Sequence, residues 1–233
     1  MAAPPRLCAD RSCLYDELLA VHTILRRGTA LVSESFGRLA GGEPVDVKVL
    51  VNTARWLIAS IRRHHASEDV LFWPALRDLV PLEALRIDEL AVAHEALDAE
   101  LQTLARTVDT LAAQHVTGEP DAALVVVGQA ALLGLPSAQR VQAVLNRHFD
   151  QEEAVLQDLM PQVPEAELTR LRKAIIGGAP HTGPHLVFGL MEDPQAVPGY
   201  APLVSNFPAP MRWIRPVLMT RYRSSKRALG VPA

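Results

Sequence analysis

The stretch HHASEDVLFWPAL, residues 64–76, does most to decide the fold of this chain. Its first histidine, His64, and Glu68 are four residues apart, and residues at that spacing share one face of an α-helix. The other positions at helical spacing on this face are apolar: Leu57, Ile61, Leu71 and Ala75. The pattern predicts a helix that directs an imidazole and a carboxyl group into an apolar core.

Three more segments place a histidine where a helix normally has an apolar core residue. They contain His22, His94 and His148, and each of these histidines lies on a stripe of apolar residues. His148 is also followed, four residues later, by Glu152. We therefore expect four inward-facing histidines on four different helices, two of them beside a glutamate on the same helix face.

The surrounding sequence is typical of a helical bundle. Strand signals are nearly absent, and long helical periods dominate. Long helices joined by short loops predict an all-α fold, an antiparallel up-down four-helix bundle with additional C-terminal helices. The four long helices are expected at residues 11–39, 45–79, 82–114 and 137–160.

Proline residues punctuate this expected bundle. Pro74 predicts a kink within the second helix, because proline removes one backbone donor. Pro136 and Pro161 are expected to bound the fourth helix. The apolar segment 121–135 is then either a short extra helix or the first part of the fourth helix.

The C-terminal part of the chain has a different composition. A short helix at residues 165–176 ends at two glycines, and the proline-rich stretch 179–210 looks like an extended wrap or linker. A last amphipathic helix is expected at residues 210–228. We therefore divide the chain into a helical bundle, residues 1–178, and an extension, residues 179–233, whose basic helix packs on the bundle.

The basic character of the last helix allows a second interpretation. It has six cations and no acid: Arg212, Arg215, Arg221, Arg223, Lys226 and Arg227. Such a helix can contact a membrane surface or nucleic acid. The interpretation that we favour is a capping helix, whose aliphatic stems cover apolar surface while the charges stay in water.

Composition bounds the class of protein. The chain has 233 residues, 49% of them hydrophobic and 21% charged, with a formal net charge of −3, so nothing demands a nucleic-acid partner. The longest apolar run, residues 122–135, is shorter than the ~20 residues of a membrane-spanning helix. The first residues lack the apolar run of a secretory signal. We expect a cytoplasmic protein without a transmembrane segment.

Helix lengths indicate that the histidines lie at one level of the bundle. Measured from their connecting loops, His22 and His64 lie 17 and 19 residues away, and Glu68 and His94 lie 11 and 12 residues away. At about 1.5 Å rise per residue, the partners differ in height by only ~2–3 Å. An intervening apolar segment prevents this comparison for His148, which joins the group by residue type and facing.

Buried imidazoles and carboxylates are costly unless something compensates them, and a bound cation is the simplest compensation. Imidazole with carboxylate suits iron, zinc, copper or manganese. Six ligands are more than one tetrahedral zinc ion takes, which favours a dinuclear site with bridging carboxylates. The sequence thus predicts a metal site built from six residues: His22, His64, Glu68, His94, His148 and Glu152.

With these motifs, residues 12–160 resemble the hemerythrin-like (HHE cation-binding) family. The most specific segments are HHASEDVLFWPAL and HFDQEEAVLQDLMP, residues 64–76 and 148–161, in which His-x-x-x-Glu is followed by another acid and an apolar run into proline. The resemblance implies two non-haem iron ions, with the four histidines as terminal ligands and Glu68 and Glu152 as bridging carboxylates.

Two positions depart from the oxygen-carrying hemerythrins. Those proteins have a second histidine on the third helix, where this chain has Asp98, so this ligand is either a carboxylate or missing. They also have an acid five residues after the last histidine, which here is Glu153. Helical geometry favours Glu152, about 40° from His148, over Glu153, about 140° away. His65 is expected to lie at the surface or behind the ligands.

The resemblance implies chemistry with a small molecule, namely O₂, peroxide or nitric oxide, and leaves three functions open. In the first, the protein is a binding or sensing module for such a molecule or simply for iron. In the second, it is a redox enzyme of peroxidase, catalase or nitric-oxide-processing type. In the third, its metal is structural, with zinc as the first choice. Asp98 and an open coordination position favour the enzyme over a classical oxygen carrier.

Overall fold

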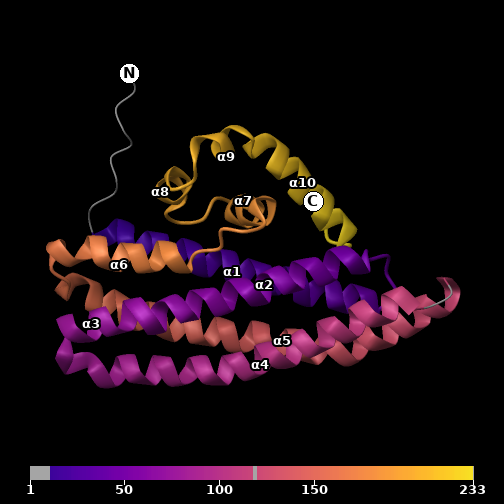
Figure 1. Cartoon of the computed structure of the whole chain (residues 1–233), viewed down its shortest axis with the longest axis horizontal. Helices are drawn as coiled ribbons and strands as arrows, with labels where there is room; N and C mark the ends of the chain where they lie inside the picture. Colours follow the sequence, from indigo (N-terminus) through magenta and orange to yellow (C-terminus); the bar gives the residue numbers. More distant parts are fainter. Residues whose placement is uncertain (1–10, 118–119, 233) are drawn as a thin grey trace.

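The computed structural model describes residues 11–117 and 120–232, and every regular element among them is a helix. Figure 1 shows the long helices lying side by side along the longest axis of the molecule, with successive helices reversing direction. Their bounds are α1 (Arg11–Ala40), α2 (Val47–Ser67), α3 (Trp73–Leu79), α4 (Ala84–Thr117) and α5 (Pro120–Leu159). Contacts of α1 with α2 and α5, and of α4 with α2 and α5, close the bundle. The predicted all-α bundle is confirmed.

The loop between α1 and α2 shows why the first two helices fold back on each other. At the end of α1, Gly42 has a positive φ of 77°, a conformation that glycine adopts without steric cost. The N–H of Glu43 there donates to the carbonyl of Arg38, which satisfies an end carbonyl of the helix. Asp46 then begins α2, its carboxylate accepting from the N–H of Val49 at 3.0 Å. Both helix ends are therefore specified by local sequence.

A π-helical turn, η1 (Glu68–Phe72), joins α2 to α3 at the place where a kink was expected. The backbone N–H of Trp73 donates to the carbonyl of Glu68, five residues back, just before Pro74. The wider turn moves later side chains around the helix axis. Leu71, expected to face the core, is 52% exposed, and Phe72, at 1% exposed, lies in the core instead.

The fourth bundle helix is longer than predicted, because α5 runs through Pro136 without interruption. The expectation that Pro136 begins this helix was wrong, and the segment 121–135 is its first part. Pro136 faces solvent, as does Leu132, whose carbonyl loses its helical donor and remains open to water. Two residues before Pro136, Gly134 lets α5 lie so close to its neighbours that a Cβ there would overlap Thr107. Packing against α4 and α1 thus keeps α5 continuous through the proline.

Several helices follow the bundle: η3 (Met160–Gln162), α6 (Glu165–Gly178), α7 (Pro184–Glu192), α8 (Tyr200–Ser205), α9 (Ala209–Trp213) and α10 (Arg215–Ala228). About half of the stretch 179–210 is therefore helical, so its interpretation as an extended wrap was wrong. Pro184 and Pro210 occupy the first turns of α7 and α9, where a missing backbone N–H costs nothing. Pro216 likewise starts α10, so the helix expected at residues 210–228 is two helices.

The C-terminal helices form a second layer over the bundle, on the side of α1 and α2 (Figure 1). Helix α6 contacts α1 and α2, and α7 contacts both α1 and α10. Tyr222 of α10 is buried and crosses Gly189 of α7 at close range. Two basic residues of α10 pair with acids, Arg215 with Glu192 and Lys226 with Asp193. These contacts join α10 to α7 within the second layer, and α7 in turn contacts α1 of the bundle. That the basic helix caps the bundle, and that the chain divides at residue 178, stay proposals.

Among the described residues, no helix combines the length and the apolar character that crossing a bilayer requires. The apolar part of α5 illustrates the point. Val127 and Ala131 are buried against the other bundle helices, while Leu132 and Leu133 on the opposite side are exposed. This segment is therefore one face of a bundle helix.

Candidate metal centre

The six residues predicted to bind metal come together in the interior of the bundle. His22 comes from α1, His64 from the last turn of α2, and Glu68 from the π-helical turn that follows. His94 lies on α4, and His148 and Glu152 lie on α5. All six are buried. The rings of His22 and His64 have centroids 5.1 Å apart, and Nε2 of His94 lies 3.0 Å from Nε2 of His148.

Each glutamate stands between two imidazoles from different helices. Oε1 of Glu68 lies 3.1 Å from Nε2 of His64, and its Oε2 lies 3.6 Å from Nε2 of His94. Glu152 repeats the arrangement, with Oε1 3.7 Å from Nε2 of His22 and Oε2 3.4 Å from Nε2 of His148. Both carboxyl groups therefore span from a His22–His64 side to a His94–His148 side of the cluster.

Most inward-facing polar atoms, unlike the paired Nε2 atoms of His94 and His148, have no hydrogen-bond partner among the described residues. This holds for both carboxyl oxygens of Glu68 and of Glu152, and for Nε2 of His22, His64 and His65. Buried polar atoms are almost always paired in proteins, because unpaired ones cost free energy. The cluster thus offers several nitrogen and oxygen lone pairs to a shared interior point, and it fits one or more cations.

Burial sets the protonation of these groups. It lowers the pKa of His22 and of His64 well below the ordinary value, so both imidazoles are neutral at pH 7. It raises the pKa of Glu68 well above its usual range, with the nearby Glu152 charge adding to the effect. For Glu152 itself, burial raises the pKa to about 8. A cation favours the neutral imidazole and the ionised carboxylate as ligands. Metal binding therefore offsets the free-energy cost of burying ionised carboxylates at this place.

Two acidic residues contact the outer ring nitrogens of His22 and His94, a role that the sequence did not predict for them. Glu153 Oε1 lies 2.8 Å from Nδ1 of His22, and Asp69 Oδ1 lies 2.8 Å from Nδ1 of His94. An Nδ1–H donated to a carboxylate fixes the tautomer, which leaves Nε2 with a free lone pair toward the cluster. The signal was present in the sequence, because each acid directly follows one of the inward-facing glutamates.

The structure resolves both departures noted in the sequence. Glu152 faces the cluster and Glu153 faces away from it, as the helical angle predicted. The Asp98 side chain is 46% exposed and accepts hydrogen bonds from Arg62 and Gln102, so it lies outside the cluster. His65, in contrast, is only 6% exposed, so of its two expected places, at the surface or behind the ligands, the surface is ruled out.

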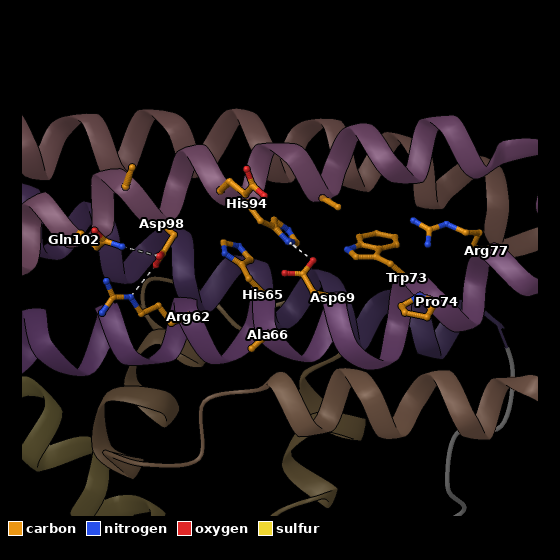
Figure 2. Close-up of a pocket in the computed structure, with 13 residues that line it drawn as sticks. Arg62, His65, Ala66, Asp69, Trp73, Pro74, Arg77, His94, Asp98 and Gln102 are labelled. Carbon is orange, nitrogen blue, oxygen red and sulfur yellow. Dashed lines mark hydrogen bonds and ion pairs between the residues drawn. The ribbon is translucent and has the colours of Figure 1, made fainter.

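A cleft of about 960 Å³ between α4 and the α2–η1–α3 segment reaches the cluster from outside. Figure 2 shows His65, Asp69 and His94 at its middle, with Arg62 and Asp98 toward one end and Trp73 and Arg77 toward the other. On the opposite side of the cluster, Phe149 stacks on His22 at 3.9 Å between ring centroids and 3° between planes. One side of the centre is therefore apolar and closed, and the other is polar and approached by a cleft.

Comparison with known families agrees with this geometry. The family model described as the hemerythrin HHE cation binding domain matches residues 13–162. No curated protein and no solved structure shows significant similarity to the chain. The matched residues cover the whole bundle and all six residues of the predicted site. This chain belongs to the hemerythrin HHE cation-binding family.

Proposed function

We propose that the bundle binds two non-haem iron ions and that the protein senses, carries or converts O₂, peroxide or nitric oxide at them. The observation that supports two ions rather than one is the position of the glutamates. Each presents one oxygen to His22 or His64 and the other to His148 or His94. A carboxylate between two pairs of imidazoles is suited to join two cations, with His22 and His64 on one and His94 and His148 on the other.

The types of ligand support iron. Neutral imidazole and carboxylate suit iron, zinc, copper and manganese, and no thiolate of the described residues joins the cluster, which argues against a soft-metal site. When bound, a pair of iron ions supplies electrons to a small oxidant. Structural zinc is the alternative, and metal analysis distinguishes it from iron.

The residues of the chain have separate tasks in this proposal. Glu153 and Asp69 hold His22 and His94 through Nδ1 and keep the two Nε2 atoms inward. Phe149 excludes water on the closed side by stacking on His22. Arg26 lies 3.0 Å from Glu153 and over the Phe149 ring, and so fixes both. The bundle interior thereby keeps the ligands rigid and separated from bulk water.

The cleft favours a redox enzyme as the second candidate function. A purely structural metal site requires no approach from solvent, whereas this cleft reaches His94 directly. Because the Arg62 pair holds Asp98 outside the cluster, no carboxylate from α4 fills the adjoining position. A small oxidant arriving through the cleft therefore meets the His94 side of the centre first.

Metal analysis and optical spectroscopy of protein from iron-fed cells test the proposal. We expect two iron ions per chain and an oxo-bridged di-ferric absorption band. Replacing His148 by alanine should abolish the band, and replacing the exposed His181 should leave it intact. A full complement of zinc, or protein that carries no metal after reconstitution, would contradict the di-iron site.

Rapid mixing of the ferrous protein with O₂, then with H₂O₂ or nitric oxide, separates the functions. A stable oxygenated band indicates a carrier or sensor. Sustained O₂ evolution or substrate oxidation indicates an enzyme. Indifference to all three molecules would contradict a role in their chemistry while leaving metal binding in place.

A further inference from the structure

His65 is buried although its position on the helix should expose it. Consecutive residues of an α-helix point about 100° apart, so a helix that directs His64 inward normally turns His65 toward its flank. Here the π-helical turn begins at Glu68, and both imidazoles are buried, His65 with 6% of its surface exposed. The polar Nε2 atom of His65 has no hydrogen-bond partner among the described residues.

The surroundings of His65 are those of a ligand rather than of a core histidine. Its donor atom and those of Glu68, His94 and His148 all lie within 4.8 Å of one another. Its ring stacks on His94 with 4.2 Å between centroids and 15° between planes, and it meets His148 edge-on at 5.3 Å. A histidine kept only for packing would need a hydrogen bond for its inner nitrogen, and a phenylalanine would fill the same space without that cost.

The facing helix leaves room for this ring. Asp98 lies one turn after His94 on α4, where a side chain directed inward would compete for the same position. Its carboxylate instead pairs with Arg62 at 3.0 Å, at the exposed edge of the cleft. As Figure 2 shows, His65 lies between this pair and the Asp69–His94 hydrogen bond.

We propose that His65 is a seventh protein ligand of the centre and gives a third imidazole to the ion held by His94 and His148. This inference rests on the proposed function, because it needs two ions. It makes the two metal positions unequal: three imidazoles on the His94 side, two on the side of His22 and His64.

The variant His65→Phe keeps the stacked ring and removes the nitrogen. In a titration of metal-free protein with Co²⁺, followed by its absorption bands and by competition with a chelator, the normal chain should bind two ions. In His65→Phe, one of the two should bind at least about tenfold more weakly, because loss of a ligand costs no less than loss of an outer partner. The other ion should keep its affinity. Asp98→Ala, which alters the facing helix outside the cluster, is the matched control and should bind both ions as the normal chain does.

X-ray absorption of the unsubstituted, iron-loaded protein gives a readout that does not depend on how the variant folds. With His65 as ligand, five imidazoles are shared by two ions, so the average should be about 2.5 per ion rather than about 2. An average of about 2, or unchanged affinity for both ions in His65→Phe, would overturn the proposal while the di-iron centre stands. If the unsubstituted chain binds no pair of ions, the proposed function fails first and this inference fails with it.

Discussion

Single residues outside the proposed ligand set decide how its histidines point. His22 and His94 each have one ring nitrogen toward the cluster and the other on a carboxylate, Glu153 or Asp69. In both cases the carboxylate comes from a different helix. Outer partners of this kind orient the ring and raise the basicity of the nitrogen that faces the metal.

Replacing Glu153 by glutamine tests this role. The charged acceptor of His22 is lost while the size of the side chain is kept, so metal affinity should fall about 10- to 100-fold. Competition with a chromophoric chelator measures the change. Asp150→Asn is the matched control, because exposed Asp150 pairs with the same Arg26 guanidinium but does not touch His22. Equal losses in both variants would show that Arg26, and not the His22 contact, carries the effect.

Removing the metal should destabilise the fold. The unpaired atoms of Glu68, Glu152 and the imidazoles remain buried without a partner when no cation is bound. At a free metal concentration of 1,000 times Kd, binding stabilises the folded state by ~4.1 kcal/mol, and Tm should rise by on the order of 10 °C for a chain of this length. Thermal denaturation with and without chelator measures the shift. A Tm independent of metal would contradict binding at this cluster.

At this scale the sequence identified the inward-facing residues but missed their neighbours. The spacing of four residues was sufficient for Glu68 and Glu152, because it concerns one helix face only. The contact of Glu153 with His22 joins α5 to α1, and its distance depends on how two helices pack. For the same reason, the burial of His65 could not be read from its own helix.

At the scale of elements, most helix positions followed from periodicity, and the errors occurred at prolines. Pro74 was expected to bend a helix, and the chain widens to a π-helical turn instead. That turn shifts the register by one residue, which exposes Leu71 and buries Phe72. Pro136 was expected to begin the fourth helix, and packing against α1 and α4 carries α5 through it. Local preference is a weak constraint where a helix is held by neighbours.

The proline in α5 gives a prediction about stability. Replacing exposed Pro136 by alanine restores a backbone hydrogen bond to Leu132 and should stabilise the chain by about 1–3 kcal/mol. Replacing Gly134 by alanine, two residues earlier, should destabilise it, because the new Cβ would overlap Thr107 and lie 3.1 Å from Phe36. Urea denaturation of both variants provides the measurement. Destabilisation by Pro136→Ala would mean that the proline is required for the shape of α5.

At the scale of the whole molecule, the helices of the second layer are held to one another by charge as well as by apolar contacts. Glu192 accepts from Arg215 and Tyr200, and Asp193 accepts from Lys226 and Tyr222. Burial alone would raise the pKa of both acids, but these hydrogen bonds outweigh it and lower the pKa of each below its ordinary value. The unfolded segment therefore takes up protons before the folded one does as pH falls.

Acid should accordingly loosen α10. The stabilisation from these two carboxylates is complete above their ordinary pKa values, near 4, and is lost as pH falls through the lowered values. We expect hydrogen exchange of the α10 amides to quicken, relative to that of α1, between about pH 5 and pH 3. Glu192→Gln has no charge to lose, so its exchange should depend less on pH. Equal acceleration throughout the chain would show that α10 does not open separately.

The cleft beside the centre is bordered by two ion pairs at the surface, Arg62–Asp98 and Arg77–Asp88. Exposed pairs weaken when salt screens them, over a Debye length of about 8 Å at physiological ionic strength. The rate at which a charged chelator enters the cleft should therefore depend on ionic strength. The rate at which a neutral gas enters should be the same in dilute and concentrated buffer.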